Sequence, residues 1–132
     1  MALTKDVNTP EREGALVSRP AAGGARVFAG SMVAVSAGGN ASSAANAPGL
    51  KVIGRAEAAV DNSAGIAGEK TVTVKRGVFR FANSATQPLG NADIYGTAYV
   101  EDDGTVAKIT TNSIPAGKVI DIDTDGVWVE IK

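Results

Sequence analysis

Short runs of β-branched and aromatic residues alternate with clusters of glycine, asparagine, aspartate and serine from residue 27 to the C-terminus. Runs and clusters at this spacing are typical of an all-β sandwich or barrel. The chain has 15 valines and only 4 leucines, so long amphipathic helices are not expected. We predict an all-β fold, a small barrel or barrel-like sandwich of about eight short strands. The expected strands are residues 27–28, 32–35, 50–60, 70–75, 94–101, 105–111, 119–123 and 127–131.

The alternation of side chains breaks in the middle of the chain. Val72 and Val74 share one strand face. Phe79 and Phe81 fall on the opposite parity. One flat strand cannot bury all four side chains together, because successive side chains point to opposite faces. We expect a bulge or bend at residues 76–77 that restores the phase.

Two aspartate-glycine turns predict hairpins in the C-terminal part of the chain. Residues 102–104 separate the runs 94–101 and 105–111, and residues 124–126 precede the last run. Aspartate followed by glycine is a strong short-range hairpin signal. In the second hairpin, the side chains expected on the inner face are Ile120, Ile122, Val127, Val129 and Ile131, and those on the outer face are Trp128 and Glu130.

Two segments lack the β pattern. Residues 1–26 scatter charged side chains among prolines and glycines, which indicates an extended N-terminal arm that orders only against a partner. Residues 36–49 are mostly alanine, glycine, serine and asparagine, so we expect a mobile surface loop. No internal repeat is convincing at the level of sequence. The predicted organisation is an arm, residues 1–26, followed by a single β-barrel domain, residues 27–132.

Charge and composition exclude several classes of partner and chemistry. The 13 basic and 14 acidic residues give a net charge of −1, so we expect neither nucleic acid nor a membrane surface as a partner. The first thirty residues contain no apolar run of about 7 to 15 residues, and no run of about 18 occurs anywhere, so neither a secretory signal nor a membrane span is expected. The chain has no cysteine and no histidine, which removes thiol chemistry and the usual general base.

The segment DIDTDG, residues 121–126, matches the first six positions of a calcium-binding loop. The twelfth position should be a glutamate and is Lys132, so we interpret the segment as a strand followed by a turn. Residues 123–126 also approach the Asp-Thr-Gly of aspartic proteases, but an additional aspartate interrupts that motif. No serine motif supplies a nucleophile with its base. We expect no enzymatic activity, no metal and no cofactor.

Two further groups of side chains could bind a ligand. One is the basic cluster of Lys70, Lys75, Arg76 and Arg80, which could contact phosphate but is more often a solvated strand edge. The other is the aromatic set of Tyr95, Tyr99 and Trp128, which could stack on a sugar but is more often part of a core or interface. Neither group is specific enough to assign a ligand.

The order and spacing of several blocks resemble the capsid cement, or head decoration, proteins of tailed bacteriophages. The blocks are FAGSMVAV at 28–35, VIGRA at 52–56, KTVTVKRGVFRF at 70–81, LGNAD at 89–93, the run 94–100 with its acidic turn, and PAG at 115–117. The resemblance covers nearly all of residues 27–132. It implies a small β-barrel, a homotrimer, that sits on the outer surface of the phage head and staples neighbouring major capsid subunits. It implies no catalytic residues.

Under this resemblance, the N-terminal arm is the expected capsid-binding element. Its apolar anchors would be Leu3, Val7, Leu16 and Val17, and its charged contacts Lys5, Arg12 and Arg19. Two alternatives stay open. One is a surface-displayed carbohydrate-binding or adhesive β module, and the other is a different virion part, such as a ring-forming tail or head-completion subunit.

Overall fold

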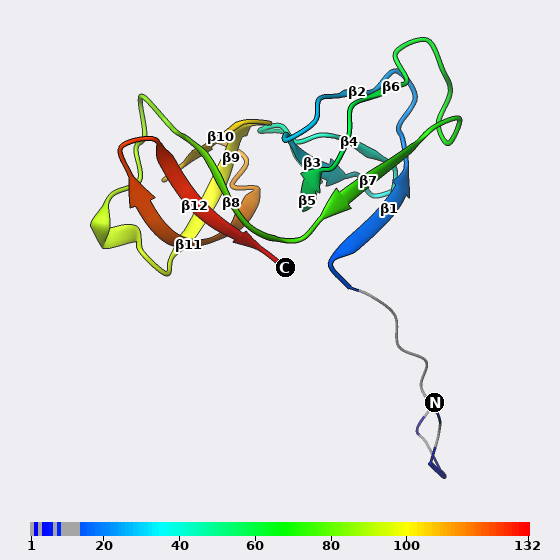
Figure 1. The fold of residues 1–132 in the computed structure, drawn as a ribbon, viewed down its shortest axis with the longest axis horizontal. Helices are drawn as coiled ribbons and strands as arrows, with labels where there is room; N and C mark the ends of the chain where they lie inside the picture. Colours follow the sequence, from blue (N-terminus) through cyan, green and yellow to red (C-terminus); the bar gives the residue numbers. More distant parts are fainter. Residues whose placement is uncertain (1, 3, 7, 9–13) are drawn as a thin grey trace.

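The computed structural model describes residues 2, 4–6, 8 and 14–132, and Figure 1 shows two β units side by side. Strands make up about half of the described residues, and these residues contain no α-helix, so the all-β prediction is confirmed. One short 3-10 turn, η1, spans Asn91–Asp93. The strands are β1 Leu16–Pro20, β2 Arg26–Val27, β3 Met32–Val35, β4 Ala41–Ser43, β5 Lys51–Ala56, β6 Val60–Asp61, β7 Thr71–Lys75, β8 Gly77–Asn83, β9 Thr97–Asp102, β10 Thr105–Ala107, β11 Pro115–Asp123 and β12 Gly126–Ile131.

The first unit, residues 16–75, is a five-stranded antiparallel sheet in the order β1-β7-β5-β3-β4. Its two edges approach each other, because Ala21 forms a parallel bridge with Ala41 directly after β1. The Ala22 amide donates to the Ala41 carbonyl at 2.8 Å, which extends this bridge by one residue. The short pair β2–β6 lies outside this sheet as a two-stranded ribbon.

The second unit, residues 77–131, is a closed five-stranded barrel in the order β10-β8-β12-β11-β9. Its neighbouring strands are antiparallel except at the closure, where β10 runs parallel to β8. Closure leaves no unpaired edge along the strands that form it, which removes the usual site of edge-to-edge aggregation. The expected barrel is therefore confirmed for this half of the chain.

The two units share one topology. In each unit the first strand pairs with the fifth, the fifth with the fourth, the fourth with the second and the second with the third, all antiparallel. In each unit the chain at the end of the first strand also runs parallel to the third. The Ser84 amide donates to the Val106 carbonyl at 2.9 Å, as Ala22 donates to Ala41. The chain is a structural duplication, which the sequence did not reveal.

A glycine at a β-bulge marks the same position in both units. The pairing register shifts next to Gly54 in β5 and next to Gly117 in β11. A methyl group on Gly54 would lie 2.7 Å from the Lys75 carbonyl oxygen. A methyl group on Gly117 would collide with the Glu130 carbonyl oxygen. Both glycines let the fourth strand approach the backbone of the fifth, which no larger residue allows without movement.

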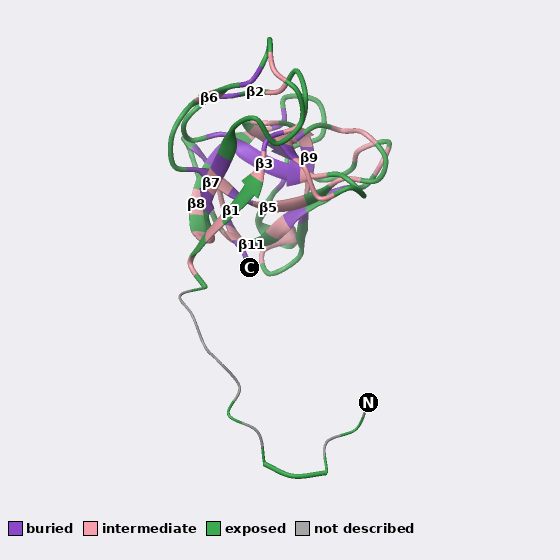
Figure 2. Ribbon diagram, turned by 90° about the vertical axis from the view of Figure 1, so that its right-hand side faces the viewer, coloured by how far each residue is buried: buried purple, intermediate pink, exposed green. Residues whose placement is uncertain are grey.

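Strand β3 joins the two units because both of its faces are buried. Val33 belongs to the core of the first unit, while Met32 and Ala34 pack into the core of the barrel unit. Side chains alternate along a strand, so the run MVAV serves two cores at once. Figure 2 shows buried residues running through the body and exposed residues in the connecting loops. Val52 of β5 also packs against the barrel core.

The break in side-chain phase lies where the sequence predicts it. Strand β7 ends at Lys75 and β8 begins at Gly77, with Arg76 between them. The break is not a bulge within one strand. It is the boundary between the two units. Val72 and Val74 are buried in the first unit, whereas Phe81 is buried in the barrel.

Both predicted hairpins are present, with one correction in the second. Strands β9 and β10 flank Asp103-Gly104, and β11 and β12 meet at the turn before Gly126. Val119 and Ile122 pair with Val129 and Val127, and the register shifts between Val119 and Asp121. Ile120 therefore sits at a bulge, not on a regular inner face, because the extra residue changes the alternation.

The expectation of a mobile loop at residues 36–49 is wrong over part of its length. Residues 41–43 form β4, which pairs with β3, and Ala41 and Ala44 are buried. The Asn46 side chain accepts a hydrogen bond from the Asn112 amide at 3.0 Å, which ties the segment to the barrel unit. Alanine and serine are small enough to form a strand that lies close to its neighbours.

The N-terminal arm is shorter than predicted. Residues 16–20 form β1, which pairs with β7 over its full length, so this part orders against its own chain. The guanidinium of Arg76 donates to the Gly14 carbonyl oxygen, and the Arg76 amide donates to the Ala15 carbonyl oxygen at 2.7 Å. Contacts with the rest of the chain therefore extend back to Gly14.

Candidate interaction surface

The structure describes four of the seven predicted arm residues. Leu3, Val7 and Arg12 lie outside the described residues. Lys5 is described and exposed. Leu16, Val17 and Arg19 lie on β1.

The three residues on β1 have different roles in the body. The Val17 side chain packs against the core of the first unit, so it is not available to a partner. Arg19 donates from Nε to the Gly39 carbonyl oxygen at 2.9 Å, which holds the β3–β4 turn. Leu16 is 50% exposed although it is a large apolar residue. Of the predicted anchors that the structure describes, Leu16 is thus the one that a partner could cover.

Leu16 is the first residue of β1. Figures 1 and 2 both show the C-terminus next to the start of β1. On the adjoining outer surface of the barrel, Val78 pairs with Glu130, and Glu130 pairs with Lys118 on its other side. We call five residues the exit face, because the N-terminal residues join the body of the protein on this side. They are Leu16, Val78, Lys118, Glu130 and Lys132.

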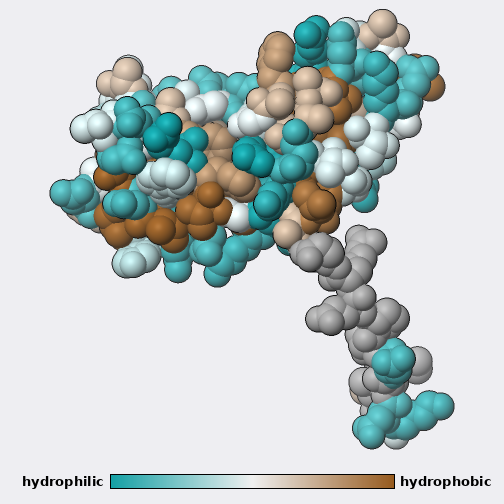
Figure 3. Space-filling view, viewed as in Figure 1, coloured by the Kyte–Doolittle hydropathy of each residue, from teal (hydrophilic) through white to brown (hydrophobic). Residues whose placement is uncertain are grey.

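The exit face combines apolar and charged groups. Val78 is 44% exposed, and the Lys132 ammonium lies 3.8 Å from the Glu130 carboxylate. Figure 3 shows apolar side chains gathered in several separate patches with hydrophilic groups between them. Mixed surfaces of this kind are typical of protein interfaces that form between separately folded partners.

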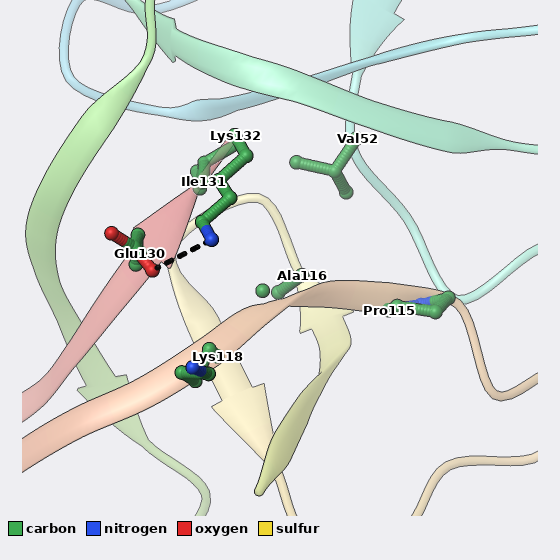
Figure 4. A pocket seen from close by; sticks show the side chains of 8 residues that line it. Val52, Pro115, Ala116, Lys118, Glu130, Ile131 and Lys132 are labelled. Carbon is green, nitrogen blue, oxygen red and sulfur yellow. Dashed lines mark ion pairs between the residues drawn. The ribbon is translucent and has the colours of Figure 1, made fainter. Parts of the chain in front are cut away.

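A groove of about 310 Å³ adjoins the exit face where the two units meet. Figure 4 shows Val52 of the first unit opposite Ile131 and Lys132, with Pro115, Ala116 and Lys118 along the other side. Gly117 forms part of the wall, and its missing side chain is required by the close approach of β12. The groove is open and presents both aliphatic carbon and one ion pair.

The acidic segment 121–126 comprises the end of β11, a two-residue turn and the start of β12. Asp123 Oδ1 accepts hydrogen bonds from the Asp125 amide at 2.8 Å and from the Gly126 amide at 3.0 Å. Asp123 Oδ2 accepts a hydrogen bond from the Trp128 indole at 2.9 Å. The Trp128 indole, followed by the Asp125 amide, lowers the pKa of Asp123 from its usual 3.8. The carboxylate therefore stabilises the hairpin, as the interpretation of this segment as strand and turn requires.

The aromatic set does not form one platform. Trp128 lies opposite Asp121, and Tyr99 lies opposite Pro115, so they contact β11 six residues apart. At about 3.3 Å for each residue of a strand, this separation is about 20 Å. Arg80 lies over the Trp128 ring at 5.7 Å from its centre, and Lys118 lies 5.8 Å from the centre of the Tyr95 ring. Trp128 and Tyr95 thus each have a cation of their own.

The basic cluster is dispersed in the same way. Lys70 donates to the Asp61 carbonyl oxygen at 2.6 Å, and Arg76 holds the start of β1. Arg80 lies beside Trp128 and 3.8 Å from the Asp125 carboxylate. These side chains serve three separate local contacts, so the structure does not bring them together as a phosphate site.

The exit face could not be predicted from the sequence, because its residues come from distant parts of the chain. The start of β1 and the C-terminus come near each other because β1 pairs with β7, while β12 pairs with β8, the strand that follows β7 in the chain. Isolated valines, lysines and glutamates carry no local motif, so nothing in the sequence identifies them as a set.

Comparison of the chain with family models, with curated proteins and with solved structures finds no match. Among the described residues, no three or more carboxylate, imidazole or thiol side chains gather as a metal-binding group. No helix in the described part of the chain is long and apolar enough to cross a membrane.

Proposed function

We propose that this protein is a capsid decoration protein that binds the outer surface of a tailed-phage head as a homotrimer. In this role it staples neighbouring major capsid subunits against the pressure of the packaged DNA. The order of blocks that resembles the cement proteins supports the proposal. So does a body in which the acidic, basic and aromatic groups identified in the sequence serve local structural contacts.

The exit face is the observation that carries the proposal. The chain enters the body there at Gly14. Leu16 is half exposed and lies on β1, an edge strand of the five-stranded sheet. A capsid subunit that contacts this face would cover Leu16 and Val78 and would pair with Lys118 or Lys132. Residues before Gly14, including exposed Lys5, would reach a second subunit from the same starting point. One decoration protein would then contact two subunits.

Stapling requires binding free energy and no chemistry. A protein that contacts two neighbouring subunits opposes their separation by the free energy of both contacts. In a trimer, the second and third contacts form at a high effective concentration, so that each contact can be weak while the assembly dissociates slowly. The mixed charges of the exit face would set orientation and specificity more than affinity.

Co-sedimentation with undecorated heads of the same phage tests the proposal. The full chain should sediment with the heads and saturate. A chain that begins at Gly14 should stay folded, because β1 is intact, and should bind at least about tenfold more weakly. Deletion through Arg26 is not suitable, because it would remove β1 and uncover Val72 and Val74.

Two single substitutions separate the exit face from exposed apolar residues in general. Leu16→Asp should weaken binding to heads about tenfold or more, because it places a charge in the covered patch. Ile109→Asp is the matched control, since Ile109 is also exposed but lies in the loop after β10. Equal binding by Leu16→Asp and Ile109→Asp would contradict the assignment of the exit face. Failure of the intact chain to bind heads would contradict the proposed function.

A further inference from the structure

An open pocket of about 370 Å³ is formed by segments of both units. Asn46 comes from the segment between β4 and β5, Glu101 from β9, and Ile109 from the loop after β10. The remaining lining residues are polar and uncharged: Thr86, Gln87, Thr110 and Thr111. The pocket shares no residue with the exit face. Its volume is at the lower end of the about 300 to 1,000 Å³ that is usual for ligand pockets, which suits one small molecule.

The fold fixes which atom of the Asn46 side chain is free. Asn46 Oδ1 accepts a hydrogen bond from the Asn112 backbone amide at 3.0 Å, and the Asn112 side chain donates to the Asn46 carbonyl oxygen at 2.9 Å. A backbone amide can only donate, so the reversed Asn46 side chain would place two donors together. Asn46 Nδ2 therefore keeps two N–H groups that are accessible and have no acceptor among the described residues.

The Glu101 carboxylate is oriented in the same way, by Ser84. Ser84 is 3% exposed, and its hydroxyl donates to Glu101 Oε1 at 2.6 Å. Ser84 Oγ also accepts from the backbone amides of Thr86 at 3.3 Å and Gln87 at 3.0 Å, so its single hydrogen belongs to the Glu101 contact. This charge-assisted hydrogen bond holds the carboxylate in one orientation. Glu101 Oε2 is accessible and meets no donor in the part of the chain that the structure describes.

The pocket thus offers two oriented donors, an oriented acceptor and an apolar contact. A hydroxyl group both donates and accepts, so two neighbouring hydroxyls of one ligand can donate to Glu101 Oε2 and accept from Asn46 Nδ2. Ile109 is aliphatic and 62% exposed, and a C–H face of the ligand would cover it. A sugar ring carries neighbouring hydroxyls at its rim and C–H groups on its faces.

Charged ligands fit the pocket less well. An anion would meet the Glu101 carboxylate, and no lysine or arginine of the described residues lines the pocket to compensate for the repulsion. A metal cation would find one carboxylate, while the free end of Asn46 presents N–H groups and no oxygen. The side chains therefore favour a neutral ligand rich in hydroxyl groups.

We propose that this pocket binds a neutral monosaccharide unit. Glu101 and Asn46 hold two neighbouring hydroxyls, and Ile109 lies against the ring. The site binds and carries out no reaction. Because the pocket is open and small, the dissociation constant of a free monosaccharide should be about 1 to 10 mM. Binding to glycans is a function beyond capsid stapling, and neither function requires the other.

Nuclear magnetic resonance of the full chain tests the proposal residue by residue. Methyl glucoside, methyl galactoside, methyl mannoside and N-acetylglucosamine are each titrated to about 50 mM, which is several times the expected dissociation constant. At least one of these sugars should shift the side-chain amide of Asn46 and the backbone amides of residues 86–87 and 109–112. These shifts should saturate in the millimolar range.

Two substitutions locate the sugar. Glu101→Gln keeps an acceptor for Ser84 and should weaken binding at least about tenfold, because the free end of the side chain becomes a donor. Asn46→Asp keeps the acceptor for the Asn112 amide and should weaken binding at least about fivefold, because both free N–H groups are lost. Glu69→Gln is the matched control and should bind normally, since Glu69 is an exposed carboxylate outside the pocket. The Tm of each variant shows whether it is folded.

The proposal is overturned if none of the four sugars produces saturating shifts at these residues by about 50 mM. It is also overturned if either pocket variant is folded and binds like the unmodified protein, or if Glu69→Gln abolishes binding. Ile109→Asp separates this site from the exit face, because it should weaken sugar binding and leave binding to phage heads unchanged.

Discussion

Replacement of Gly117 by alanine should strongly destabilise the barrel unit. A methyl group at this position would lie 2.8 Å from Val129 Cγ1 and closer still to the Glu130 carbonyl oxygen. The neighbouring residue Ala116 is buried, so β11 cannot move outward without disturbing the core. The added methyl group can therefore be accommodated only if β11 and β12 move apart.

The magnitude follows from the contacts that must change. Restoring an ordinary carbon–carbon contact requires Val129 to move by about 0.6 Å, and restoring the contact with Glu130 requires more. Overpacking of this kind costs about 1 to 3 kcal/mol. Stretching two ladder hydrogen bonds adds about 0.5 to 1.5 kcal/mol for each. We predict that Gly117→Ala lowers the free energy of unfolding by about 3 kcal/mol, which corresponds to a decrease in Tm of about 10 °C.

Urea unfolding followed by circular dichroism measures the effect. Gly54→Ala should cost about 2 kcal/mol, because the equivalent contact with the Lys75 oxygen is 2.7 Å and thus less severe. Gly90→Ala is the control, since Gly90 has an extended backbone and no heavy atom within 4 Å of the added methyl. It should change stability by less than about 0.5 kcal/mol. A stability for Gly117→Ala within about 1 kcal/mol of the unmodified protein would refute the described packing of β11 against β12.

Three other predictions concern the turn, the linking loop and the assembly. Hydrogen bonding lowers the pKa of Asp123 from 3.8, so its ionised form stabilises the fold above that pH and the contribution is lost as the pH falls through the lower folded pKa. Asp123→Asn should therefore have a lower Tm than the unmodified protein at pH 6, and the difference should shrink below about pH 4; a pH-independent difference would contradict this. Asn46→Ala removes the acceptor of the Asn112 amide and should lower the free energy of unfolding by about 1 kcal/mol. Hydrogen exchange at the Asn112 amide should become faster, and unchanged exchange would contradict the contact. Analytical ultracentrifugation should give about three times the chain mass of 13.3 kDa, whereas a monomer or a larger ring would exclude the trimer.

The sequence predicts the fold class and several local features because those depend on nearest neighbours. The hairpin at Asp103-Gly104 and the phase break at Arg76 are encoded by residues that are adjacent in the chain. A valine run broken by glycine carries enough local information to place a strand and its end. These features are found in the structure where they are expected.

The duplication could not be predicted because the two units share geometry rather than sequence. Gly54 and Gly117 occupy equivalent bulges, yet a large Ile53 precedes the first glycine and a small Ala116 precedes the second. The closure of each unit depends on a contact between the end of the first strand and the third strand, some twenty residues apart. Strand pairing at that distance is decided by packing of the whole unit, which a local pattern does not record.

The predictions for the arm and for the alanine-rich loop are wrong for a related reason. Residues 16–20 contain Ser18, Arg19 and Pro20, which favour no regular element on their own. They become a strand because β7 offers an antiparallel partner and the Val17 side chain reaches the core. In the same way, Ala41 is buried by its neighbours and not by any apolar run of its own. Tertiary contacts decide both segments.

Electron microscopy of undecorated phage heads incubated with this protein tests the central claim most directly. The proposed function predicts added density on the outer surface of the head at local three-fold positions, with one exit face toward a capsid subunit in each of three copies. Heads that remain bare at saturating protein, or density confined to a tail or portal ring, would contradict it.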